Sequence, residues 1–446
     1  MTLFHRGRLF ILIVRTLAQK YTKALTLGFI SGLVLSLVLW RVVPFIRERW
    51  FTPVDRIGIV GEFTPTTLPL SVQEHVSGGL TRIGPDGTVQ PSLATSWIAT
   101  DSGKTVVFTI RPDAVWQNGK EVTATDVNYN IQGVTFTAID AHTLRATLKA
   151  PYSPFPAVVA KPLFLSGLVG WGEYKVTSIS LQGDTVMILR LAPLSGAGHV
   201  REYHFYTTEA QAILAYKLGE VNTLQDLSGP ADLTHWGTTT ITTTTNTDRL
   251  VALYFNLGVP TLAGKNVRQA LAFAVPITQG AERADSPISK TSWAYSSKVK
   301  DYSFDIAEAK KLLGTTKESS QSARLTISTF APYLDEAQTI ATSWTAVGMP
   351  TDVKVVSTVP PNYQVLLSAQ DLPPDPDQYP FWHSTQTATN ITGYANVKID
   401  KLLEDGRQEL DKNKRKAIYA DFQRYLTEDV PADFLYYANS YTVTRN

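Results

Sequence analysis

The sequence predicts a mixed α/β protein that folds into two lobes or domains. The chain has 446 residues, which is too long for one ordinary hydrophobic core. Hydrophobic residues make up 43% of it and charged residues 18%, a balance that is typical of globular proteins and not of disordered ones. Strand-like runs and helical patterns both occur along the chain, which indicates the mixed class.

The N-terminal region has the pattern of a membrane anchor. Residues 24–40 carry no charge, and together with the apolar residues that follow Arg41 the segment 24–46 is long enough to span a bilayer. A basic tail at 1–23 favours a cytoplasmic N-terminus, with the chain from residue 50 onward extracellular or periplasmic. No small-x-small cleavage site directly follows the apolar run, so we expect an uncleaved, single-pass signal anchor; a cleaved signal peptide is the alternative.

Residues 91–127 contain several local structure signals in succession. Thr105–Ile110 is a β-branched and aromatic run that predicts a strand. Asn118-Gly119 predicts a two-residue hairpin turn with positive φ angles. Thr123 and Asp126 form a capping-box pattern, which predicts the start of a helix. Nothing in this stretch is suited to act as a nucleophile, base or metal ligand, so it is predicted to be scaffold.

Further elements follow from the spacing of apolar residues. Strands are predicted at 185–191 and 323–330. Helices are predicted at 266–275, at 305–314 and around 418–426. In the second of these helices, Asp305 is the expected N-cap, Glu308 its capping-box partner and Gly314 the C′ residue. The threonine-rich run at 237–247 predicts an edge strand or a strand that connects the lobes, with an O-glycosylated stalk as the alternative.

The charge distribution argues against a nucleic-acid partner. The formal net charge is +2, but eight of the 41 basic residues and only one of the 39 acidic residues lie in the first 49 positions. The remainder therefore carries an acidic excess, whereas a nucleic-acid-binding domain would present a basic patch. The chain has no cysteine, which excludes disulfides, thiolate nucleophiles, zinc sites built on cysteine and a lipid-attachment cysteine.

An enzyme is disfavoured by the absence of catalytic motifs. The histidines are scattered without HExxH or another ligand spacing. Gly-x-Ser-x-Gly, a Walker A loop and a dinucleotide-binding fingerprint are also missing. We therefore expect no catalytic residues, no cofactor and no metal site.

The stretch at 91–127 resembles a signature of the family 5 extracellular solute-binding proteins, which deliver peptides, nickel complexes and related solutes to ABC importers. The matching residues are Pro91, Leu93, Ala94, Trp97, Arg111, Trp116, Asn118, Gly119, Thr123, Ala124, Asp126 and Val127. Segments at 140–155, 170–176, 205–222, 266–275, 286–295, 375–382 and 392–437 are similar to later family motifs, in the family's order. The segment between 131 and 140 is shorter than is usual in the family, which implies a trimmed outer subdomain.

The resemblance implies a two-lobed, periplasmic-binding-protein-like fold of type II, in the large peptide-binding class. It places the first lobe at 50–250, completed by about 428–446, and the second lobe at 251–427. Such proteins close on a solute by a hinge motion and pass it to the permease subunits of an ABC transporter. We expect a monomer that is held at the membrane by its N-terminal helix.

The resemblance also implies binding residues in the cleft. Asp371 matches the acidic residue that receives the α-amino group of a peptide, although the spacing from it to Asp375 is one residue longer than usual. Turn-forming or capping roles for these carboxylates are the alternative. Aromatic pocket residues are expected at Tyr379, Trp382 and His383, with core packing as the alternative for the first two. Ser77 and Gly78 are expected to meet the ligand from the first lobe.

A peptide is the expected solute. A nickel chelate or an oligosaccharide bound by the same fold is the alternative, and so is a tethered sensor that does not transport. The lack of a histidine cluster disfavours direct nickel binding.

Overall fold

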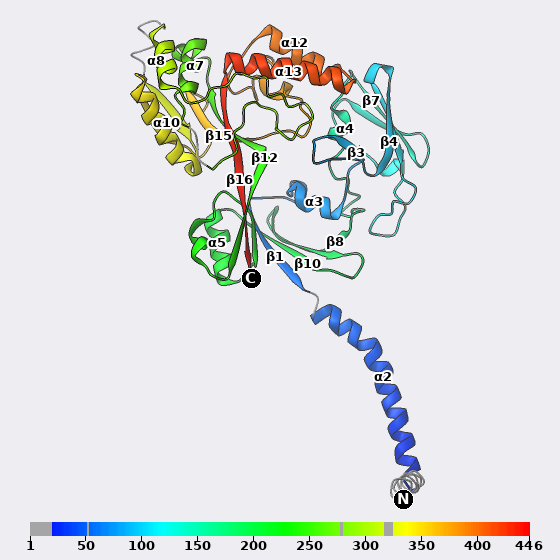
Figure 1. The fold of residues 1–446 in the computed structure, drawn as a ribbon. Coiled ribbons are helices and arrows are strands. Elements are labelled where there is room, and N and C mark those ends of the chain that lie inside the picture. Colours follow the sequence, from blue (N-terminus) through cyan, green and yellow to red (C-terminus); the bar gives the residue numbers. More distant parts are fainter. Residues whose placement is uncertain (1–19, 51–52, 277–279, 316–323) are drawn as a thin grey trace, which may run out of the picture.

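Two long antiparallel strands connect the two ends of the globular part of the molecule (Figure 1): β12, Thr239–Phe255, and β16, Ala432–Arg445. The computed structural model describes residues 20–50, 53–276, 280–315 and 324–446. The register of β12 against β16 shifts between Thr245 and Leu250. We call residues 53–245 with 439–446 the first lobe and residues 250–437 the second lobe. The predicted lobe boundaries at 250 and 428 stay a prediction.

The strands form one large sheet and two smaller ones. The large sheet has the order β14-β13-β15-β12-β16-β11-β1-β10-β9-β8, and the smaller sheets have the orders β2-β3 and β4-β5-β7-β6. The remaining strands are β1 Val54–Val60, β2 Thr81–Ile83, β3 Val89–Pro91, β4 Ala94–Thr100, β5 Thr105–Ile110, β6 Val134–Ala138, β7 Thr143–Leu148, β8 Tyr174–Gln182, β9 Thr185–Pro193, β10 Val200–Tyr206, β11 Thr223–Leu227, β13 Leu325–Thr329, β14 Thr351–Val355 and β15 Val365–Asp371.

Helices cover both faces of the sheet in the second lobe (Figure 1). The described helices are α2 Thr22–Trp50, α3 Leu70–Val76, α4 Phe155–Val158, α5 Glu209–Leu218, α6 Pro260–Ala263, α7 Lys265–Phe273, α8 Ile306–Gly314, α10 Leu334–Ala346, α11 Tyr379–Trp382, α12 Val397–Gln408 and α13 Lys412–Asp429. Short 3₁₀ turns lie at 101–103, 124–126, 231–235 and 331–333.

The end of β12 is buried on both faces because the second lobe has two hydrophobic cores. Val251, Leu253 and Phe255 pack into the core under α7, α8 and α10, while the alternating residues Leu250, Ala252 and Tyr254 pack into the core under α12 and α13. A strand covered on both faces needs a continuous apolar run, which "LVALYF" supplies. The residues in the threonine-rich half of the same strand are exposed or half-buried, which suits a β-branched polar residue.

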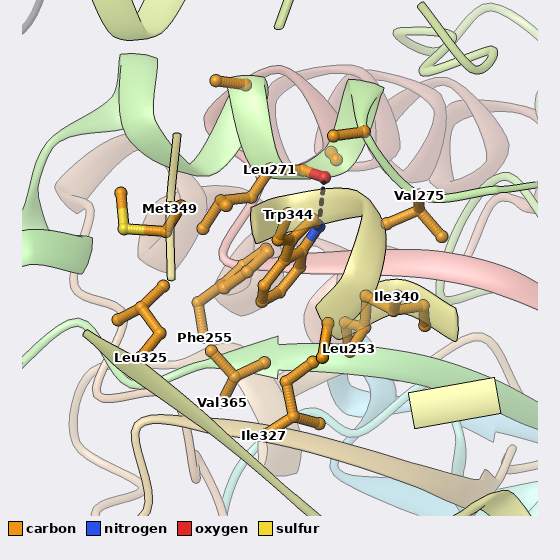
Figure 2. Close-up of a cluster of buried hydrophobic side chains, with 14 of the residues drawn as sticks. Leu253, Phe255, Leu271, Val275, Leu325, Ile327, Ile340, Trp344, Met349 and Val365 are labelled. Atoms are coloured by element: carbon orange, nitrogen blue, oxygen red, sulfur yellow. Dashed lines mark hydrogen bonds between the residues drawn. The ribbon is translucent and has the colours of Figure 1, made fainter. Parts of the chain in front are cut away.

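Trp344 of α10 is central to the first of these cores (Figure 2). Its side chain is fully buried and stacks on Phe255, with ring centroids 6.2 Å apart. Its indole N–H donates a hydrogen bond to the carbonyl oxygen of Leu271 in α7, at 2.9 Å. This bond satisfies the one polar atom of the side chain, so the tryptophan can join two helices and the sheet without leaving a buried donor unpaired.

The structure confirms most of the predicted elements and corrects three details. The strands at 185–191 and 323–330 correspond to β9 and β13, and the threonine-rich run connects the lobes as part of β12. The Thr123–Asp126 capping box forms, but it starts only a 3₁₀ turn. At the tight turn only Gly119 has a positive φ, because Asn118 stays outside the left-handed region. Gly314 is the last residue of α8 and not a left-handed C′ residue.

The predicted membrane anchor is not confirmed. The N-terminal helix α2 extends away from both lobes in Figure 1. In the part of the chain that the structure describes, no helix is both long enough and apolar enough to cross a membrane.

Candidate functional site

A cavity of about 830 Å³ lies between the two lobes. One wall comes from the first lobe, from α3 and the residues before it, from β2 with the β2–β3 turn, and from the end of α4 with the segment after it. The other wall comes from the second lobe and from the β12 segment between the lobes. The lining residues are Leu68, Leu70, Gln73, Glu74, Arg82, Ile83, Gly84, Pro85, Gly87, Ala157, Val158, Ala160, Lys161, Thr247, Asp248, Ser289, Thr291, Ser292, Pro373 and Pro374. Its volume is within the range of small-molecule binding sites.

An irregularity in β12 brings two polar residues into this cavity. Between Thr245 and Leu250 the strand has four residues for one residue of β16, so it bulges away from the ladder. The side chain of Asn246 accepts a hydrogen bond from the backbone N–H of Asp248 at 3.0 Å and fixes the bulge. As a result Thr247 and Asp248 line the cavity at the point where the lobes join.

Four charged side chains line the cavity: Glu74 and Asp248 are acidic, and Arg82 and Lys161 are basic. None of the four has a side-chain hydrogen bond or ion pair to another residue that the structure describes. Burial by the surrounding walls raises the pKa of Glu74. Burial also raises the pKa of Asp248, and the negative charge of Asp371 raises it further. The cavity therefore offers unpaired charges of both signs.

A second cavity of about 360 Å³ is also lined by residues of both lobes. Its lining includes the aromatic side chains of Trp97, Tyr152 and Trp293. The ion pair of Asp375 with Arg415, a bidentate contact with N–O distances of 2.5 and 2.8 Å, borders it from the second lobe.

The β2–β3 turn of the first lobe contacts the second lobe. The backbone N–H of Trp293 donates to the carbonyl oxygen of Asp86 at 3.2 Å. Gly87, next to Asp86, has a φ of +71°, and a Cβ there would lie 3.4 Å from the carbonyl oxygen of Pro374. The turn of the first lobe therefore lies directly against the second lobe.

The sequence-predicted residue Asp371 lies at the end of β15, outside the lining of both cavities. Its carboxylate accepts a hydrogen bond from Arg249 Nε at 2.9 Å, and its side chain is 77% exposed. Arg249 also bonds both carboxylate oxygens of Asp226, at 3.2 and 3.3 Å. Asp371 is thus already engaged by a cation of the protein itself.

The predicted aromatic contacts also lie outside the two cavity linings. Trp382 is buried in the second-lobe core, where its ring meets Phe434 edge to face. Tyr379 and His383 stack on each other with centroids 4.0 Å apart. His383 Nδ1 lies 2.8 Å from the hydroxyl of Thr385. The structure therefore brings Tyr379 and His383 together, but away from the unpaired charges of the larger cavity.

Ser77 and Gly78 follow α3 and have structural contacts. The hydroxyl of Ser77 is fully buried and donates to the carbonyl oxygen of Leu163. The carbonyl oxygen of Gly78 accepts from the indole N–H of Trp171 at 2.9 Å. Neither residue lines either of the two cavities described above, although Gln73 and Glu74 of the preceding helix line the larger one. The predicted ligand contacts of all six residues stay predictions.

Sequence reasoning missed Asp248 and Glu74. A signal for Asp248 is present, since Asn246-Thr247-Asp248 interrupts the strand pattern with two turn-forming residues. Glu74 has no comparable signal, because a glutamate on a short helix is ordinarily a solvated residue. In the described ranges, no three His, Cys, Asp or Glu side chains are grouped so that they could hold a metal ion.

Comparisons with known proteins agree with this architecture. The family model described as bacterial extracellular solute-binding proteins, family 5, matches residues 88–390. The chain is 24% identical over 461 residues to the dipeptide-binding protein DppE of Bacillus subtilis, covering 82% of each protein.

Solved structures show the same fold. CtaP, an ABC transporter substrate-binding protein from Listeria monocytogenes, matches with a TM-score of 0.75 and 21% identity over 88% of this chain and 94% of CtaP. NikZ from Campylobacter jejuni, solved in complex with Ni(L-His), matches with a TM-score of 0.73 and 20% identity over the same shares. AppA from Bacillus subtilis, solved with a nonapeptide, matches with a TM-score of 0.68 and 18% identity over 89% of this chain and 95% of AppA.

Proposed function

Since the chain belongs to the bacterial extracellular solute-binding proteins of family 5, we propose that it captures short peptides in the larger cavity and delivers them to the permease subunits of an ABC importer. The observation that carries this proposal is the set of unpaired charges on the cavity walls. A peptide with free ends is a zwitterion, so its ammonium group suits Glu74 or Asp248 and its carboxylate suits Arg82 or Lys161.

The position of the cavity between two lobes supports capture by closure. A solute that contacts both walls binds more tightly to the conformation in which the walls are close together, and it therefore shifts the population toward that conformation. Both lobes contribute polar groups here, since Arg82 comes from the first lobe and Ser289 and Thr291 from the second. No covalent step is needed for this function, and we propose that the chain catalyses none.

Two relatives support the peptide as the solute, and one supports an alternative. DppE is a dipeptide-binding protein and AppA was solved with a nonapeptide. NikZ was solved with Ni(L-His), in which the chelator is an amino acid. A nickel ion that arrives with its own chelator is therefore the second candidate, because it would need no metal ligands from the protein.

We also propose that the N-terminal segment 24–46 tethers the binding part to a membrane, on its outer side. The support is the uncharged run at 24–40 and the basic residues that precede it. Partition of the full chain into the membrane fraction, and release of residues 53–446 by proteolysis from outside the cell, would test this topology. Recovery of the full chain in the soluble fraction would contradict it.

Native mass spectrometry of the full chain tests the proposed solute. The protein is purified from a heterologous host without refolding, and any bound molecule is then released by denaturation and identified. We expect a ladder of short peptides. A released sugar or nickel chelate would leave the binding fold intact and contradict the peptide proposal. Binding of the protein to a permease can be measured with and without solute. Binding that requires the solute would support transport, and no binding would support a sensor.

A further inference from the structure

We propose that Arg249, in the segment of β12 between the lobes, forms a hinge clamp with Asp226 of the first lobe and Asp371 of the second, and that this clamp favours the closed conformation. The inference rests on the proposed capture by closure, but it does not depend on which solute is bound. Arg249 lies outside the lining of both cavities. It is therefore a positioning residue, which acts on binding through the angle between the lobes.

The pairing of β12 with β16 is interrupted where the lobes join. The last pair on the side of the first lobe is Thr245 with Asn439. The first pair on the side of the second lobe is Leu250 with Tyr437. Residues 246–249 have no partner in this ladder, so they can absorb a change in the angle between the lobes without breaking a row of backbone hydrogen bonds.

The side chain of Arg249 spans this interruption because a carboxylate from each lobe binds it. Its Nε lies 2.9 Å from the carboxylate of Asp371, its ladder partner on β15. Its Nη1 donates to both carboxylate oxygens of Asp226, at 3.2 and 3.3 Å. Asp226 belongs to β11, which pairs with β1 and with the first-lobe end of β16. The guanidinium therefore connects the two lobes at the joint.

A second irregularity places the side chain of Asp226. The pairing of β11 with β16 shifts in register between Leu224 and Leu227, and Asp226 has a φ of +56°. A bulge of this kind changes the direction in which a side chain leaves the strand. The left-handed conformation is strained for most residues, but Asp and Asn adopt it more readily than others with a side chain. The partner of Arg249 is thus positioned by a backbone conformation that few residue types tolerate.

The clamp forms together with the closed conformation. In this structure the lobes are in contact, because the backbone N–H of Trp293 donates to the carbonyl oxygen of Asp86. An opening motion that moves β11 away from β15 lengthens the bonds between Arg249 and Asp226, whereas the ladder keeps Arg249 beside Asp371. The energy of the Asp226 contact is then lost, so the contact shifts the population toward closure.

Ionic strength should change the strength of the clamp. The side chains of Arg249 and Asp226 are 34% and 48% exposed, so dissolved ions screen their attraction. Asp226 and Asp371 contact the same guanidinium, and they repel each other when its charge is removed or screened. A clamp of this kind makes the balance between the open and closed conformations depend on salt.

Double electron–electron resonance of the full chain tests the proposal. The chain has no cysteine, so Lys120→Cys in the first lobe and Lys416→Cys in α13 give two specific spin-label positions, both at exposed residues. Without solute we expect a shorter distance from closed protein and a longer one from open protein. Asp226→Asn keeps the shape of the side chain and tolerates the left-handed conformation. It should lower the ratio of closed to open protein by about two- to fivefold.

Salt gives a readout that a purely structural effect would not change. Raising the NaCl concentration from about 0.05 to 1 M should lower the ratio of closed to open protein when Asp226 is present, and should lower it less in Asp226→Asn. Asp232→Asn is the matched control, because Asp232 pairs with Lys217 inside the first lobe. This control should have the ratio and the salt response of the unsubstituted protein.

Thermal unfolding of each variant is measured first. If Asp226→Asn is poorly folded, Arg249→Lys replaces it, since an ammonium group keeps the charge but lacks the planar fork that reaches two carboxylates; it should also lower the ratio. An equal ratio in the variant and the unsubstituted protein would overturn the clamp. An unsubstituted protein that is only open without solute would overturn it as well.

Addition of tri-alanine tests the proposed function separately from the clamp. The peptide should increase the population at the shorter distance in the unsubstituted protein and in every variant. If it does so while Asp226→Asn has no effect of its own, the clamp is wrong and capture by closure stands. If the peptide changes no distance, the proposed capture of peptides fails, whereas the comparison of variants without solute still decides the clamp.

Discussion

At the scale of single residues, the surroundings of a carboxylate decide what it can do. Asp371 is neutralised by an arginine, Asp375 by another, and Asp248 by none that the structure describes. An acidic residue that is paired within the protein contributes to folding, whereas an unpaired one in a cavity is available to a ligand. The carboxylate of Asp433 is in a third kind of environment, because it is buried inside the fold.

Asp433 of β16 makes the stability of the protein depend on pH. It is 5% exposed, and its burial raises the pKa to about 7, with Arg283 opposing the shift and Asp301 adding to it. Because the pKa is raised in the folded state, the folded state holds the proton more tightly than the unfolded one. Stability is therefore highest below the unfolded pKa of about 4 and falls as the pH rises toward 7.

The variant Asp433→Asn should remove this dependence. We expect the difference in melting temperature, variant minus wild type, to increase as the pH is raised from 4 to 8, since the asparagine never has to ionise in the core. Measuring the difference cancels the contributions of the other titrating groups. A difference that stays constant over this range would show that Asp433 does not titrate as described.

The sequence predicts which residues are buried or lie in loops better than it predicts which residues they contact. The acidic loop at 371–377 could be recognised from sequence, but the partner of Asp371 is Arg249, which lies 122 positions earlier and meets it only through the pairing of β12 with β15. Short-range spacing carries no information on such a contact. The burial of Trp382 was foreseen as an alternative, because a large aromatic residue next to apolar neighbours usually packs in a core.

At the scale of elements, local signals set where an element starts and tertiary packing sets how far it continues. The capping box at Thr123 forms as predicted, but the chain leaves the helical conformation at Val127, whose side chain is buried in the first-lobe core with Trp116. The strand pattern of β12 was recognisable along its whole length, whereas its bulge was not, since the bulge depends on the register against β16. The sequence thus predicts the helices and strands better than the irregular positions within them and at their ends.

The connection from α3 to β2 depends on a close backbone approach at Gly79. A Cβ at this position would lie 2.5 Å from the backbone of Ala160 and of Val159. Gly79→Ala should therefore push two backbone segments apart and lower the free energy of unfolding by about 1 to 3 kcal/mol or more. Gly314→Ala is the matched control, because it has no atom within 4 Å and no positive φ; it should leave stability unchanged or raise it slightly. Urea unfolding of both variants checks this, and equal stabilities would contradict the account.

At the scale of the whole molecule, a few contacts away from the larger cavity hold the lobes together. The backbone N–H of Ser153 donates to the carbonyl oxygen of Arg407 at 2.7 Å, and its hydroxyl donates to that of Gly406 at 3.1 Å. The first residue belongs to the first lobe and the other two to α12 of the second. Such contacts form only when the lobes are close, so they favour the conformation that encloses a solute.

Ser153→Ala should weaken solute binding without touching the larger cavity. Loss of one hydrogen bond across the lobes costs about 1 kcal/mol, which corresponds to an affinity lower by about fivefold for tri-alanine. Ser195→Ala is the matched control, because the hydroxyl of Ser195 bonds only within its own loop, to Ala197 at 3.0 Å. Small-angle scattering should show a larger average radius of gyration for the Ser153 variant at subsaturating peptide. Unchanged affinity and radius would mean that this contact does not stabilise closure.

We expect a short peptide to bind between the lobes and to contact both walls of the larger cavity. Hydrogen–deuterium exchange of the full chain with and without tri-alanine tests it most directly. We expect slower exchange in the peptide-bound protein at residues 70–87 of the first lobe and, at the same time, at residues 246–249 and 289–292 across the cavity. Protection limited to one wall, or protection only around Trp97 and Trp293 at the smaller cavity, would contradict the account.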